Sequence, residues 1–67
     1  MNEQLVEMAI MALTQEIENT PDNALLYKER GRLRMMIGLK REAMEDVQKA
    51  LQLDPQLAGS LNGKYQN

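Results

Sequence analysis

The chain has 67 residues and therefore forms one small domain at most. It contains no cysteine and no histidine, which excludes disulfides, thiolate metal sites and histidine-dependent catalysis. The net charge of −2, the sequence pI of about 5.0, the absence of a long apolar run and an acidic N-terminus predict a cytoplasmic protein without a membrane span or a signal peptide.

The first predicted helix covers residues 2–19 and has more apolar side chains than one face can hold. Its main stripe, which should pack on the rest of the chain, contains Val6, Ala9, Ile10, Leu13 and Ile17. A second stripe contains Leu5, Met8, Met11 and Ala12. Because a helix that is apolar on two sides is normally buried on two sides, we predict that this second stripe is a homodimer interface or docking surface. The alternative is a loosely covered methionine surface.

The second predicted helix covers residues 24–37 and begins after Pro21, which interrupts the preceding helix. Asp22 or Asn23 can cap its first turn. Its main apolar stripe is predicted to contain Leu26, Leu33 and Ile37, with Tyr27, Gly31 and Met35 on the adjoining flank. Gly31 costs about 1 kcal/mol relative to alanine inside a helix, so we expect a neighbouring backbone to pass close to it.

The third predicted helix covers residues 40–53. A left-handed Gly38 should end the second helix, and a turn this short makes the two helices an antiparallel hairpin. The apolar face is predicted to contain Ala43, Met44, Val47, Ala50 and Leu51, and the polar surface Glu42, Glu45, Asp46, Gln48, Lys49 and Gln52. Pro55 ends this helix, and Leu57, Ala58 and Leu61 of the following segment are expected to cover the end of the core.

An internal repeat of 34 residues relates the first helix to the third. At this offset Ala9 matches Ala43, and Pro21 matches Pro55. The first helix therefore corresponds to the second half of a repeat unit whose first half is absent.

The central unit resembles the tetratricopeptide repeat family, most strongly over residues 22–55. The spacing of that family is kept by Tyr27, Gly31, Ala43, Val47 and Pro55. The resemblance implies an all-α antiparallel array in one domain over residues 1–67, with three helices and a short C-terminal capping helix. A half repeat would cover residues 1–20, a full repeat residues 22–55, and a capping turn and tail residues 56–67. Arg30 and Arg34 depart from the family pattern at positions that normally pack inward.

Charge is segregated along the chain. Residues 1–23 contain five acidic and no basic side chains, whereas residues 28–41 contain six basic side chains and one acidic. An inward-facing arginine needs a carboxylate or carbonyl partner, so we expect Arg30 and Arg34 to pair with acidic neighbours.

The resemblance also places Lys28 and Arg32 on the wall of a concave groove, with Met35 and Met36 continuing along it. A basic pair beside flexible apolar side chains predicts a binding site for an acidic or amphipathic peptide, and a merely solvated basic face is the alternative. We predict a scaffold-like protein-binding module, self-associating as a homodimer, whose partner is another protein or peptide.

Two other functions are compatible with the sequence. The first is a purely structural helical homo-oligomer. The second is nucleic-acid binding through the basic helix 28–41, which the acidic surroundings and the lack of interleaved aromatic residues disfavour. No nucleophile–base pair, phosphate-binding glycine loop or metal-ligand spacing is present, so neither an enzyme nor a cofactor is expected.

Overall fold

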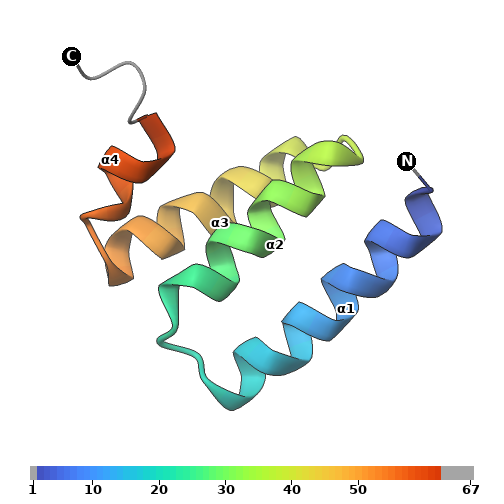
Figure 1. The fold of residues 1–67 in the computed structure, drawn as a ribbon, viewed down its shortest axis with the longest axis horizontal. Helices are drawn as coiled ribbons and strands as arrows, with labels where there is room; N and C mark the ends of the chain where they lie inside the picture. Colours follow the sequence, from blue (N-terminus) through green and yellow to red (C-terminus); the bar gives the residue numbers. More distant parts are fainter. Residues whose placement is uncertain (1, 63–67) are drawn as a thin grey trace.

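A computed structural model describes residues 2–62 and contains helices but no strand within that range. The helices are α1 (Glu3–Asn19), α2 (Ala24–Met36), α3 (Lys40–Leu53) and α4 (Leu57–Asn62). Consecutive long helices run antiparallel, and α2 packs against both α1 and α3, whereas α4 follows α3 and contacts it (Figure 1). The predicted all-α array of three helices with a short fourth helix is confirmed. No helix between residues 2 and 62 is both long enough and apolar enough to cross a bilayer.

Asparagine side chains and one glycine set the helix boundaries. Asn2 caps α1 and Asn23 caps α2, each through a side-chain oxygen that accepts a hydrogen bond from the backbone N–H two residues later. At the other end, α2 stops at Met36, one residue earlier than predicted. Gly38 has a φ of +84°, the left-handed conformation expected of it, and this lets the chain reverse directly into α3.

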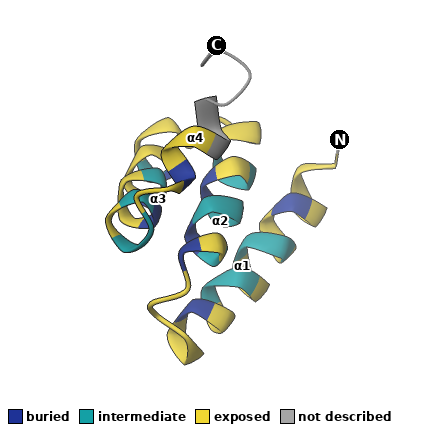
Figure 2. Cartoon of the chain, turned by 60° about the vertical axis from the view of Figure 1, so that its left-hand side comes forward, coloured by how far each residue is buried: buried dark blue, intermediate teal, exposed yellow. Residues whose placement is uncertain are grey.

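The core lies among the C-terminal end of α1, the N-terminal end of α2, the C-terminal end of α3 and the first residue of α4. Its buried residues are Ile17, Ala24, Tyr27, Ala50 and Leu57, with Leu26, Leu51 and Leu53 packed against them. The side chains that face away from neighbouring helices are exposed, including those on the outer side of α1 (Figure 2).

The predicted orientation of α2 was partly wrong. Leu26, Leu33 and Ile37 are only half-buried, whereas Tyr27 and Gly31 of the expected flank are buried. The reason is that α2 contacts helices on two sides, so its most buried face lies between α1 and α3. The Tyr27 hydroxyl donates a hydrogen bond of 2.9 Å to the backbone carbonyl of Pro21, which joins α2 to the turn before it.

The close approach expected at Gly31 is confirmed. A Cβ at this position would lie 3.1 Å from the backbone oxygen of Ala43 and 3.1 Å from the Cβ of Asp46. Glycine therefore lets α2 and α3 pack more closely than any other residue would allow.

Two predictions for α3 were wrong. Asp46, placed on the polar surface, is buried, and Met44, placed on the apolar face, is 52% exposed. The buried face instead contains Ala43, Asp46 and Ala50, at i, i+3 and i+7. Met44 follows Ala43 by about 100° around α3, which turns it away from the buried face of Ala43, Asp46 and Ala50.

Of the three residues predicted to cover the end of the core, Leu57 is buried, whereas the side chain of Leu61 lies outside the described part of the chain. Ala58 is exposed, contrary to the prediction. The Asp54 side chain accepts a hydrogen bond of 3.1 Å from the backbone N–H of Gln56, and this shapes the turn into α4. The rest of the predicted tail, residues 63–67, lies outside the described residues.

Candidate functional site

A cluster of charged side chains joins the three long helices. Arg30 of α2 donates two hydrogen bonds to Asp46 of α3, from Nε to Oδ2 (2.9 Å) and from Nη2 to Oδ1 (2.7 Å). Arg34 donates a third, from Nη1 to Oδ2 (2.8 Å). The side chain of Asp46 is only 5% exposed, and those of Arg30 and Arg34 are 13% and 21% exposed. This Asp46 triad (Arg30, Asp46, Arg34) confirms that both arginines face inward and have a carboxylate partner.

Arg30 also connects the triad to α1. Its Nη1 donates a hydrogen bond of 3.2 Å to the hydroxyl of Thr14, and its guanidinium carbon lies 5.7 Å from the ring centre of Tyr27, within cation–π range. The hydrogen bonds to Asp46 raise the pKa of Arg30, although burial opposes the shift. The Asp46 carboxylate is thus engaged with both arginines, and Arg30 links it to α1, which favours a structural role for the triad.

A hollow of about 240 Å³ opens between α2 and α3 on another side of the hairpin. It is lined by Lys28, Gly31, Arg32, Met35 and Val47. Three of the four predicted groove residues are thus brought together here, whereas the fourth, Met36, is not part of the lining. Gly31 and Val47 were missed as site residues because each was assigned to helix packing alone.

The exposed side of α2 extends the hollow along the helix. Leu25, Lys28, Arg32 and Met36 are spaced at i, i+3, i+7 and i+11, so they share this side. Leu25 is 56% exposed and was not predicted, although the same spacing could have revealed it. Arg32 forms a surface ion pair of 2.8 Å with Glu29. Exposed pairs of this kind contribute little to stability, so a carboxylate from a partner can replace Glu29 at low cost.

A second apolar surface lies on the far side of α1. Leu5, Met8 and Met11 are 62%, 64% and 64% exposed, and Ala12 is exposed beside them. We call these four residues the α1 outer face. At about 100° per residue, Glu16 borders this face on one side and Glu18 on the other. The predicted docking stripe is therefore accessible and has acidic edges.

Comparisons with known proteins give one partial likeness. A 51-residue stretch is 39% identical to Protein SGT1 homolog of Oryza sativa subsp. japonica. This stretch makes up 76% of the present chain but only 14% of the rice protein. No protein-family description and no solved structure matches the chain. The similarity is thus to one short segment of a much longer protein.

Proposed function

We propose that this chain is a protein-interaction module of the tetratricopeptide repeat type. It would bind an acidic or amphipathic peptide segment in the hollow and associate with itself through the α1 outer face. The observation that carries this proposal is the hollow, whose surface is apolar, with Met35, Val47 and the aliphatic stems of Lys28 and Arg32 in its lining. Such a lining matches a segment that presents apolar residues between carboxylates.

Three further observations support the family assignment. The hairpin of α2 and α3 is closed by a left-handed Gly38, and Gly31 lies directly against the α3 backbone. The two departures from the family pattern, Arg30 and Arg34, are accommodated together by Asp46. The partial identity with a segment of the rice protein fits a module that occurs within longer chains.

The alternatives receive less support. Nucleic-acid binding would use the basic residues of the second helix, but Arg30 and Arg34 are paired with the buried carboxylate of Asp46, which disfavours their use as phosphate contacts. A purely structural homo-oligomer would use the α1 outer face and would leave the basic hollow without a role. We therefore favour binding over catalysis and over a purely structural role.

A peptide titration tests the proposal. The probe is a blocked helical peptide of about 15 residues, long enough for partial helicity in isolation, with leucines at i, i+3 and i+7 between glutamates. Amide chemical shifts of the labelled protein should change around Gly31, Arg32 and Val47. The same peptide with lysine in place of glutamate should bind much more weakly, because its charges oppose those of the hollow.

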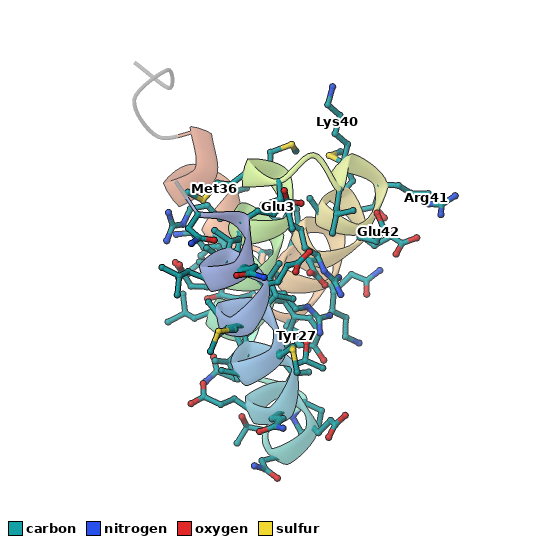
Figure 3. The ribbon with its side chains drawn as sticks, turned by 90° about the vertical axis from the view of Figure 1, so that its right-hand side faces the viewer. Glu3, Tyr27, Met36, Lys40, Arg41 and Glu42 are labelled. Atoms are coloured by element: carbon teal, nitrogen blue, oxygen red, sulfur yellow. The ribbon has the colours of Figure 1, made fainter. Side chains whose placement is uncertain are left out.

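Two matched double variants separate the hollow from general basic charge. Lys28→Ala/Arg32→Ala removes two charges at the hollow, whereas Lys40→Ala/Arg41→Ala removes two charges that project from the start of α3 (Figure 3). The first should weaken peptide binding by about tenfold or more, equivalent to about 1.4 kcal/mol, and the second by less than about threefold. Equal losses in the two variants would show that the hollow is not the binding site.

A further inference from the structure

The two apolar surfaces of the molecule have opposite electrostatic character. The α1 outer face belongs to a segment, residues 1–23, with five acidic and no basic side chains. The hollow has two basic residues in its lining, Lys28 and Arg32, and Arg32 is paired with Glu29 at the surface. Each surface presents exposed methionine, Met8 and Met11 on one and Met35 on the other. The two are thus complementary in charge and alike in apolar character.

These surfaces cannot meet within one chain. On α2, Arg30 reaches toward Thr14 of α1, whereas Lys28 and Arg32, two residues before and after it, line the hollow. Two residues correspond to about 200° around a helix, so α1 and the hollow lie on opposite sides of α2. The α1 outer face in turn points away from α2 (Figure 2).

We propose that the hollow receives the α1 outer face of a second copy of this chain, so that copies associate head to tail. This inference rests on the proposed function and names the amphipathic segment that the hollow binds. Met11 and its neighbours would insert beside Met35 and Val47, and Glu16 and Glu18, one to two turns further along α1, would lie within reach of the long basic side chains. A hollow of about 240 Å³ is smaller than typical small-molecule sites of about 300–1,000 Å³, and it suits side chains that project from a helix.

A symmetric pairing of two α1 outer faces fits the charges less well. It would bring the acidic borders of both helices together, with no basic side chain in either segment to offset them. A head-to-tail contact instead opposes acidic and basic segments. The head-to-tail contact joins two different surfaces that face away from each other. Every assembly therefore keeps a free hollow at one end and a free α1 outer face at the other, and it grows beyond two copies.

A mixing experiment distinguishes the two arrangements. Met8→Glu disables the α1 outer face and Met35→Glu disables the hollow; both side chains are exposed, so circular dichroism should show folded proteins. Sedimentation equilibrium between about 10 µM and about 1 mM protein measures the number of copies per particle. Each variant alone should be monomeric, whereas the wild type should exceed two copies per particle. Mixed together, they should form a 1:1 complex that does not grow, because the mixture contains one intact surface of each kind.

The control is Leu39→Glu, which adds the same charge at a 40% exposed residue in the hairpin turn, outside both surfaces. It should associate as the wild type does. If either methionine variant is unfolded, Glu18→Lys and Arg32→Glu, both at exposed side chains, replace the pair in the same mixing experiment. In all cases raising the salt concentration should weaken the complex, since the contact depends on charges near the surface.

Three results would overturn the inference: a wild type that is monomeric throughout, a mixture that forms no complex, or a Met35→Glu variant that still dimerises while Met8→Glu does not. The last result would indicate the symmetric α1 pairing. The acidic peptide should be titrated into Met8→Glu, which keeps an intact hollow. Peptide binding there without wild-type self-association would refute head-to-tail assembly but leave the proposed peptide binding in the hollow standing. Self-association without peptide binding would refute the proposed peptide binding but leave self-association standing.

Discussion

Replacing Asp46 with asparagine tests the role of the buried charges most directly. The substitution keeps the shape of the side chain and removes its negative charge. Asp46 is 3% exposed and accepts three hydrogen bonds from two guanidinium groups. In the variant both arginines would retain their charges beside a neutral amide whose N–H groups cannot accept a hydrogen bond.

The expected loss of stability follows from these contacts. Breaking a buried ion pair by neutralising one partner costs about 3–5 kcal/mol. Arg34 is 21% exposed and can turn toward water, and asparagine keeps one acceptor oxygen, so we expect the lower end of that range, about 3 kcal/mol. A 67-residue domain has a total stability of about 3–10 kcal/mol. The variant should therefore lose a large part of its stability and be partly unfolded at room temperature if the wild type is at the low end.

Urea unfolding followed by far-ultraviolet circular dichroism measures this loss. With a slope of about 1 kcal/mol per molar urea for so small a protein, the midpoint should fall by about 3 M. Glu45→Gln is the matched control, because it neutralises an exposed carboxylate on the neighbouring position of α3 and should change stability by less than about 0.5 kcal/mol. If Asp46→Asn shifted the midpoint no more than this control, the triad would not be a stabilising element and the reasoning would fail.

Two further substitutions test the packing of α2. Gly31→Ala should lower the free energy of unfolding by about 1 kcal/mol despite a gain in helix propensity of about the same size, because the added Cβ would lie 3.1 Å from the Ala43 backbone oxygen. Thermal melts measure this change, and Gly59→Ala is the control, because no atom lies within 4 Å of the added Cβ there. A Gly31→Ala variant that is more stable than the wild type would contradict the close approach. Tyr27→Phe should cost about 1 kcal/mol through loss of the hydrogen bond to the Pro21 carbonyl, and an unchanged urea midpoint would show that this bond is not stabilising.

Much of the fold was predictable from local patterns. Pro21, Asn23, Gly38 and Pro55 mark where helices begin and end, because each acts through the backbone of its own neighbourhood and needs no distant contact. The 34-residue repeat makes the first helix equivalent to the third, which indicates that both pack on the helix between them, since equivalent segments pack in equivalent ways. The spare apolar stripe of α1 was likewise visible, because one helix cannot turn two faces toward the same neighbour.

The candidate site was only partly predictable. Lys28, Arg32 and Met35 share a side of one helix, and helical spacing alone is enough to group them. Val47 joins them from α3, and that depends on the distance and rotation between two helices. Met36 was assigned to the same groove because it follows Met35. It shares the exposed side of α2 with Lys28 and Arg32, but it lies about 100° further round the helix from α3 than Met35 and is outside the lining.

The sequence by itself determined the helices, their order, the two apolar faces of α1 and the segregation of charge, since each depends on residues near one another in the chain. The tertiary structure alone decided that Asp46 is buried and Met44 is open. Helical periodicity describes faces relative to one another, but the rotation of α3 against α2 depends on the close contact at Gly31 and on Arg30 and Arg34 both reaching one carboxylate. That rotation also leaves a basic hollow on one side of α2, opposite the acidic helix on the other.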